Sequence, residues 1–297
     1  MNNYNVLPDY NTRLHLERNL LEKYSFIKRE LVGKSLCNRE IYAYTIGSGN
    51  IKTLYAGAFH GMEWLTSLVL IKFLEDCCQA LDSNKNILNF RIADFLKTNS
   101  LTIIPCINPD GVEIQQKGSS SCHKFKRLID FIATDTNHWQ ANARGVDLNH
   151  NFNAGWQRLK RLEIKKGITK PSSTRYGGKK PFSEAETIAL VDFCIKHKFD
   201  KAFAFHSQGR EIYWDFGKST PENSRLMANI LADSAGYTVS TPEGLAIGGG
   251  FKDWFIEYFK KPAFTVEIGL GKNPLPLSDF KEEYSRLLPL LCLGVII

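Results

Sequence analysis

Residues 54–63 read Leu-Tyr-Ala-Gly-Ala-Phe-His-Gly-Met-Glu. The first six are apolar or small, which predicts a buried strand, and the apolar residues of Trp64–Asp76 repeat with helical spacing. His60 and Glu63 therefore lie where a strand gives way to a helix, and both side chains can turn toward one point. An imidazole nitrogen and a carboxylate oxygen are two of the three protein ligands of a catalytic zinc site.

Further strands and helices alternate along the chain. Apolar and β-branched runs predict strands at Leu36–Ile46, Lys52–Phe59, Ser100–Ile107, Lys201–His206 and Ala263–Ile268. Predicted helices are Asn11–Lys28, Trp64–Leu81, one opened by a capping box at Ser183-Glu-Ala-Glu186 and running to Lys198, one starting at Thr220-Pro221, and one from Ser278 onward. Asn108-Pro-Asp-Gly111 predicts a turn, and the polar stretches 118–147 and 153–181 predict long loops.

This order of elements predicts an α/β fold. Strands that alternate with helices form a mixed, mostly parallel, twisted sheet with helices on both faces, which is a three-layer sandwich. No change of composition marks a linker. We therefore expect residues 1–297 to form a single domain, with a helical segment at about 1–35 packed on it.

Charge and cysteine content disfavour some classes of protein. The formal net charge of +7 is small for 297 residues, and the nearest approach to a basic block, Lys160–Lys166, is expected to be a solvated face. Nucleic acid is therefore not an expected partner. Seven cysteines without paired spacing predict reduced thiols in a reducing compartment.

Neither end of the chain carries a predicted targeting or membrane segment. The N-terminus has no basic region followed by an apolar core, so no signal peptide is predicted. The apolar run Leu287–Ile297 is too short to span a bilayer and contains Pro289, so it is expected to be a helix packed on the core. These features predict a cytoplasmic protein without a membrane partner.

Polar side chains stand at the ends of four predicted strands, at His60, Asn108, His206 and Glu267. Sites in α/β sheets gather at the carboxyl ends of strands, so we expect these side chains to share one site. A lone His beside an apolar strand is more often structural. With His60 and Glu63, however, His206 would complete a three-ligand metal set that leaves one position for a water, whose pKa the metal would lower.

Glu267 lies within the apolar run Phe264-Thr-Val-Glu-Ile268. A buried carboxylate is costly unless it is paired or used, so it is either an ion-pair partner of an Arg or a general base for the metal-activated water. The segment Arg144–Phe152 adds further polar groups. Asp147 could accept a hydrogen bond from His60, and Asn149 could hold a substrate carboxylate or amide. The alternative is an Asx-rich turn.

Four motifs, taken in order, are similar to those of the zinc carboxypeptidase superfamily: His60-x-x-Glu63, Gly145-Val-Asp-Leu-Asn149, His206-Ser and Phe264-Thr-Val-Glu267. The likeness is closest to bacterial γ-D-glutamyl-meso-diaminopimelate peptidases, which cleave peptidoglycan stem peptides. It runs over almost the whole chain and includes Gly248-Gly-Gly-Phe-Lys-Asp-Trp254. The resemblance implies one Zn²⁺ per chain on His60, Glu63 and His206, with Glu267 as general acid/base.

The sequence departs from the family pattern at charged positions. The family's Asp-x-Asn-Arg motif ends here in His150, and a neutral His cannot form the bidentate carboxylate clamp of Arg. His150 is then either a weaker clamp or a packing change. Carboxylate binding could instead have moved to one of three cations, Arg144, Arg210 and Lys252. A second family Arg aligns near Gln140, and the mobile Tyr of the digestive enzymes aligns near Leu245.

Lys252 aligns with the residue that sets side-chain preference in digestive carboxypeptidases. A Lys there implies an acidic group on the substrate, and diaminopimelate carries carboxylates at both ends. Asp253 would then meet the ammonium of the same substrate, or else be a buried structural residue.

The function that this resemblance implies is hydrolysis of the bond between γ-D-Glu and meso-diaminopimelate in a stem peptide or muropeptide, in recycling or spore formation. Two alternative hypotheses for an enzyme are a conventional carboxypeptidase and a deacylase of acyl amino acids. A reading of a different class is a degenerate enzyme that binds muropeptides without cleaving them. The retained ligands and Glu267 favour an enzyme.

Overall fold

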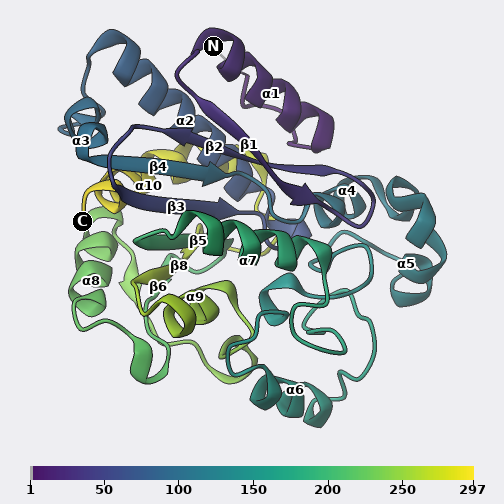
Figure 1. The fold of residues 1–297 in the computed structure, drawn as a ribbon. Helices are drawn as coiled ribbons and strands as arrows, with labels where there is room; N and C mark the ends of the chain where they lie inside the picture. The colour runs from purple at the N-terminus through teal and green to yellow at the C-terminus, as the bar shows by residue number, and fades with distance from the viewer. Residues whose placement is uncertain (1–2) are drawn as a thin grey trace.

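Eight strands form one sheet in the computed structural model, which describes residues 3–297 (Figure 1). They are β1 (Lys28–Lys34), β2 (Glu40–Ile46), β3 (Ile51–Gly57), β4 (Asn99–Ile104), β5 (Lys201–Ser207), β6 (Glu211–Tyr213), β7 (Thr238–Val239) and β8 (Ala263–Ile268). Their order across the sheet is β1-β2-β4-β3-β5-β8-β6-β7. The central strands β4, β3, β5 and β8 are parallel, and antiparallel pairs join β2 and β6 to them.

The helices are α1 (Tyr10–Lys23), α2 (Leu65–Ser83), α3 (Ile92–Thr98), α4 (Pro109–Lys117), α5 (Lys126–Ile132), α6 (Trp156–Lys165), α7 (Ala185–His197), α8 (Ser224–Ala235), α9 (Phe251–Phe259) and α10 (Phe280–Ile296). Short 3₁₀ helices are η1 (Gly61–Glu63), η2 (Ser119–Phe125), η3 (Leu148–His150), η4 (Gly217–Ser219), η5 (Gly244–Ala246) and η6 (Leu277–Asp279). Helices α2, α8 and α10 cover one face of the sheet, and α7 and α9 cover the other (Figure 1).

Strand β5 shows how the sequence separates the two cores. Phe203 and Phe205 pack with the apolar residues of α2 and α10, whereas Ala202 and Ala204 pack with those of α7 and α9. Successive side chains of a strand point to opposite faces, so one apolar strand serves both layers. The predicted α/β three-layer architecture is confirmed.

Most predicted elements are present, with shifted ends. The strand Ala263–Ile268 matches its prediction, and Pro289 lies inside α10 as expected. The predicted helix Asn11–Lys28 is too long, because Tyr24 has an extended backbone and β1 begins at Lys28. The predicted strand Leu36–Ile46 instead begins at Glu40, after a hairpin turn in which Asn38 has a φ of 69°.

Other predictions are wrong in detail. Asn108 starts a helix, because its side chain accepts a hydrogen bond from Gly111 N and caps α4. The capping box does not form, since Glu184 is the N-cap of α7 and makes no capping hydrogen bond. Helices α8 and α10 start later than predicted, at Ser224 and Phe280. Strands β1, β6 and β7 and helices α3 and α9 were not predicted, and the two predicted loops contain η2, α5 and α6.

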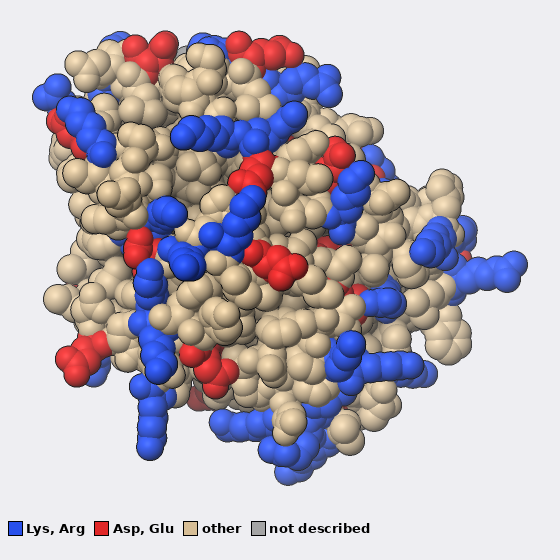
Figure 2. Space-filling model, in the orientation of Figure 1, with Lys and Arg blue, Asp and Glu red and all other residues tan. Residues whose placement is uncertain are grey.

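Basic and acidic side chains are interspersed over the face seen in Figure 2. Helix α6 holds most of the Lys160–Lys166 segment and turns Leu159 and Glu163 inward while Arg161 and Lys165 are exposed, so this segment is largely a solvated face. Between residues 3 and 297, no helix is both long and apolar enough to cross a membrane.

Candidate metal centre and catalytic cavity

A cavity of about 430 Å³ opens at the carboxyl ends of β3, β5 and β8. Eight of the site residues named from the sequence line it, among them His60, Asp147, Asn149, His150, His206, Lys252 and Asp253. Glu267 lines it as well, together with Gln140 and Leu245. Sites of this fold class are expected at this edge of the sheet.

His60, Glu63 and His206 converge beside this cavity. His60 Nδ1 lies 2.7 Å from Glu63 Oε1, and His206 Nδ1 lies 2.9 Å from Glu63 Oε2. One ligand atom from each residue lies within 4.8 Å of the others. Two imidazoles and a carboxylate match the donors that zinc takes in catalytic sites, so the residues present fit this metal.

The local fold brings these ligands together. Strand β3 ends at Gly57, and the η1 turn that follows places Glu63 one 3₁₀ turn after His60. His206 comes from β5, which pairs with β3 in parallel. The side chains of Glu63 and His206 are almost fully buried, and the ring of Phe59 stacks on that of His206 at 5.0 Å between centroids.

Charge couples the three residues. Burial alone would raise the pKa of Glu63, but the charges and hydrogen bonds of His60 and His206 outweigh it and lower that pKa. Burial would lower the pKa of His60, yet the carboxylates of Glu63 and Asp147 raise it well above its usual value. The Glu63 carboxylate thus lies between two imidazoles, and a divalent cation held by these three residues would supply a positive charge in place of an imidazole proton.

Asp147 supports His60 from behind. Its Oδ1 lies 3.0 Å from His60 Nε2, and its Oδ2 accepts a hydrogen bond of 2.9 Å from Arg175 N. Burial would raise the pKa of Asp147, but the charge of His60 and the other partners hold it well below its usual range. Since Asp147 occupies Nε2, the other ring nitrogen of His60 is left to face Glu63.

Glu267 lies next to the candidate metal ligands His60, Glu63 and His206. It is paired in register with His206 across β5 and β8. Burial, and then the negative charge of Glu63, raise its pKa well above the usual value. No ion pair links Glu267 to an arginine among residues 3–297. The fold therefore does not use Glu267 as the buried partner of an arginine.

Two of the expected substrate-binding cations point elsewhere. Arg144 donates to Glu184 Oε1 at 2.9 Å and lines a separate hollow. Arg210 is bonded to Glu283 and is absent from the cavity lining. Asn108 is also outside the cavity, because its Nδ2 donates to the carbonyl oxygens of Phe59, Gln140 and Ala141.

The remaining expected residues lie in the cavity wall. Lys252 is only 5% exposed, and its Nζ donates to Asp253 Oδ1 and to the carbonyl oxygen of Asp215. Asp253 Oδ2 accepts from Gly248 N at 2.7 Å. Asn149 Oδ1 accepts from Phe251 N at 2.9 Å, which leaves its amide nitrogen available to a ligand.

Arg175 is a cavity residue that the sequence did not reveal. It lies in the polar stretch 153–181, where no motif distinguishes it from other basic residues. Its guanidinium makes no hydrogen bond or ion pair with the part of the chain that the structure describes. Lys166 is a second basic residue that lines the cavity and was not predicted there.

Comparison with known proteins places this geometry in a family. A family profile described as zinc carboxypeptidase matches residues 15–288. The chain is 33% identical over 291 residues to gamma-D-glutamyl-L-diamino acid endopeptidase 1 of Lysinibacillus sphaericus, covering 97% of this chain and 72% of that protein.

Two solved structures share the fold. The structure of thrombin-activatable fibrinolysis inhibitor has a TM-score of 0.78 at 20% identity, covering 98% of this chain and 74% of that one. Murein-tripeptide amidase MpaA from Escherichia coli O157 has a TM-score of 0.58 at 20% identity, covering 89% of this chain and 91% of that one.

Proposed function

Since the chain belongs to the zinc carboxypeptidase family and is a metallopeptidase, we propose that it hydrolyses the bond between γ-D-Glu and meso-diaminopimelate in peptidoglycan stem peptides. The observation that carries this proposal is the 33% identity, over 97% of the chain, to a γ-D-glutamyl-L-diamino acid endopeptidase. Hydrolysis is supported by the convergence of His60, Glu63 and His206 beside a cavity that also holds Glu267.

In this proposal His60, Glu63 and His206 hold the zinc. When bound, zinc supplies a Lewis acid that polarises the scissile carbonyl and makes a water more acidic. Asp147 fixes the orientation of the His60 ring through Nε2. Glu267 accepts a proton from the attacking water and delivers it to the leaving amine, for which its position beside the cluster is suitable.

The cavity also offers charges that match the substrate. Diaminopimelate ends in an ammonium and a carboxylate, and Lys252 and Asp253 lie side by side in the wall with opposite charges. Such a pair is complementary to an amino-acid end group. We assign this end group to Lys252 and Asp253.

We assign a second substrate carboxylate to Arg175. Lys252 already donates to two protein oxygens, whereas the Arg175 guanidinium has no protein partner among the described residues. An unpaired guanidinium can bind a carboxylate through two parallel hydrogen bonds. Arg175 therefore takes over the role that Arg144 and Arg210 cannot perform, and the Asn149 amide supplies a neutral donor nearby.

The test compares two tripeptides incubated with the zinc-loaded protein, L-Ala-γ-D-Glu-meso-diaminopimelate and L-Ala-γ-D-Glu-L-Lys. The second lacks only the distal carboxylate. Mass spectrometry should detect free diaminopimelate from the first and much slower release of lysine from the second. In Lys252→Ala the preference for diaminopimelate should largely disappear.

Other outcomes would contradict the assigned bond. Cleavage of α-linked C-terminal residues in preference to the γ-linked peptide would indicate a conventional carboxypeptidase. Preferential cleavage of N-acyl amino acids would indicate a deacylase. Tripeptide binding without any cleavage, with zinc bound, would indicate a muropeptide-binding protein.

A further inference from the structure

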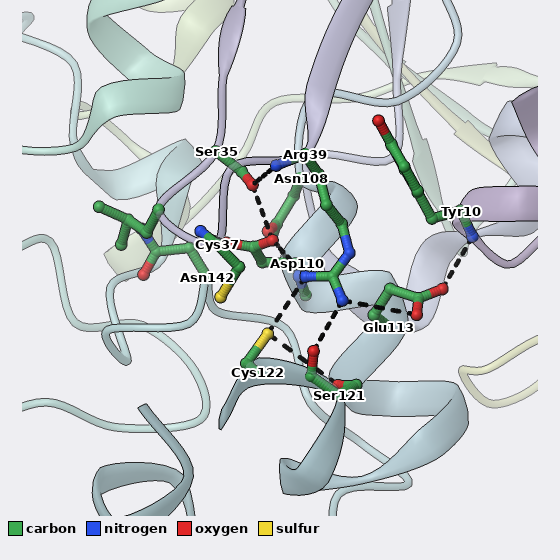
Figure 3. A network of polar contacts seen from close by, with 12 residues as sticks. Tyr10, Ser35, Cys37, Arg39, Asn108, Asp110, Glu113, Ser121, Cys122 and Asn142 are labelled. Carbon is green, nitrogen blue, oxygen red and sulfur yellow. Dashed lines mark hydrogen bonds and ion pairs between the residues drawn. The ribbon is translucent and has the colours of Figure 1, made fainter. Parts of the chain in front are cut away.

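A second cluster of reactive groups lies outside the cavity, around two cysteines (Figure 3). Cys37 is in the turn between β1 and β2, and Cys122 is in η2. Both sulfur atoms and one carboxylate oxygen of Asp110 lie within 4.8 Å of one another. Cys37 is partly exposed and Cys122 is 1% exposed, so Cys37 is the residue of the pair that a small reagent would meet first.

The surroundings of Asp110 do not suit a metal ion. Its Oδ1 accepts hydrogen bonds of 2.7 Å from both Ser35 Oγ and Arg39 Nη1, and its Oδ2 accepts one of 2.9 Å from Cys37 N. The carboxylate is therefore already occupied by protein donors. A divalent cation between these groups would also lie against the Arg39 guanidinium, which already supplies a positive charge (Figure 3).

The same surroundings do suit a thiolate. Arg39 Nη1 lies 3.4 Å from Cys122 Sγ, and the Ser121 hydroxyl lies 4.0 Å from it. A hydrogen bond from Cys37, together with Arg39, lowers the pKa of the Cys122 thiol. The reciprocal contact with Cys122 and burial raise the pKa of Cys37. Of the two thiols, Cys122 is therefore the more acidic.

We propose that Cys37 and Cys122 form a reversible thiol–disulfide pair that reacts with small disulfides. Cys37, the more exposed residue of the pair, loses its proton and forms a mixed disulfide with the reagent, while the departing reagent sulfur takes up a proton and leaves as one small thiol. The Cys122 sulfur then attacks the Cys37 sulfur and releases the second small thiol. Two protein thiols become one disulfide and the reagent disulfide becomes two thiols, so two electrons and two protons pass to the reagent.

The bridge would tie together segments that support the metal centre. Asp110 lies in the first turn of α4, whose N-cap is Asn108. The Asn108 side chain donates to the carbonyl oxygens of Phe59, Gln140 and Ala141, directly behind the loop that carries His60. Oxidation would thus link the β1–β2 hairpin covalently to η2, beside this support. The proposal does not depend on which peptide the cavity cleaves.

The experiment uses the full chain, reduced and then exposed to oxidised glutathione at neutral pH. After free thiols are blocked with iodoacetamide in denaturant, trypsin should yield the peptide Ser35–Arg39 joined to Gly118–Lys124. Five of the seven cysteines should remain alkylated, including the buried Cys77 and Cys292. Dithiothreitol should restore alkylation of all seven.

The matched variants are Cys37→Ser and Cys122→Ser. In Cys122→Ser the Cys37 peptide should carry glutathione, and in Cys37→Ser the Cys122 peptide should stay alkylated. The proposal is overturned if wild-type protein gives glutathione on Cys37 with no link to Cys122, or if neither thiol reacts. It is also overturned if wild-type protein binds one zinc ion more per chain than Cys122→Ser, because the cluster would then be a metal site.

Discussion

At the scale of single residues, His150 and Arg175 belong together. His150 stands where the family pattern has an arginine, and its Nδ1 lies 3.0 Å from the carbonyl oxygen of Arg175. The amide nitrogen of Arg175 donates to Asp147, the carboxylate that supports His60. Its φ of 63° is unusual for a residue with a side chain. His150, which replaces the arginine of the family pattern, therefore helps to hold the backbone of Arg175, a basic residue that lines the same cavity.

Replacing Arg175 tests its assigned role. Arg175→Ala should raise KM for the diaminopimelate tripeptide about 10- to 100-fold, since a hydrogen bond to a charged group contributes about 1.5–3 kcal/mol. The kcat should change little, and Arg175→Lys should recover part of the loss. Arg225→Ala, an exposed arginine on α8, is the matched control. An unchanged KM in Arg175→Ala would remove this residue from the substrate site.

At the scale of elements, the sequence predicts the strands better than the long connections. Ala263–Ile268 is apolar and β-branched, so its pattern survives in any context that buries it. Helix α6 was missed because its segment is mostly polar, with only Leu159 and Glu163 buried. The partner of Arg144 was also hidden, because Glu184 is 40 residues away and only the folded chain brings them together.

The residues of the candidate site also differ in whether the sequence alone could identify them. His60, His206 and Glu267 stand at or just beyond strand ends, Glu63 follows His60 by three residues, and all four could be named from the sequence. Arg175 could not, because its place in the cavity depends on hydrogen bonds between a loop and Asp147. Lys252 and Asp253 were named separately, while their mutual bond appears only in the structure.

The contact between η1 and α4 gives a prediction at this scale. A Cβ atom on Gly61 would lie 2.3 Å from Gly111 O and 2.7 Å from Trp139 O, which are backbone atoms that cannot move aside easily. Gly61→Ala should lower the free energy of unfolding of the zinc-free protein by about 1–3 kcal/mol in urea, and should weaken zinc binding by displacing His60. Met62→Ala, in the same turn, is the control. Wild-type zinc affinity in Gly61→Ala would show that η1 tolerates displacement.

At the scale of the whole molecule, Glu186 joins three distant segments. It is fully buried in α7, and its carboxyl oxygens lie 3.3 Å from Leu36 N and from Asn142 Nδ2. Burial, together with the charges of Asp110 and Glu184, raises its pKa to about 8. The folded state therefore keeps Glu186 protonated at a pH where the unfolded chain ionises it.

This raised pKa predicts how stability depends on pH. Between pH 4.5 and 8 the unfolded chain binds fewer protons at Glu186 than the folded chain does, so this residue makes the free energy of unfolding fall as pH rises. The loss has an upper bound of about 5 kcal/mol and is complete above the folded pKa. In Glu186→Gln this contribution is absent, so the variant should gain stability relative to wild type as pH rises. Urea unfolding at several pH values measures this, and a constant difference would contradict it.

The central claim is that the metal centre uses Glu267 as its general base. The most direct test compares wild type with Glu267→Gln and measures both bound zinc and turnover of the diaminopimelate tripeptide on the same samples. Both proteins should bind one zinc per chain, and kcat of the variant should be about 10²- to 10⁴-fold lower. The control is Glu211→Gln, which should stay near the wild-type rate. Glu211 lies opposite Glu267 in the register of β6 and β8, but it does not line the cavity. Turnover by Glu267→Gln at the wild-type rate, with zinc bound, would contradict the account.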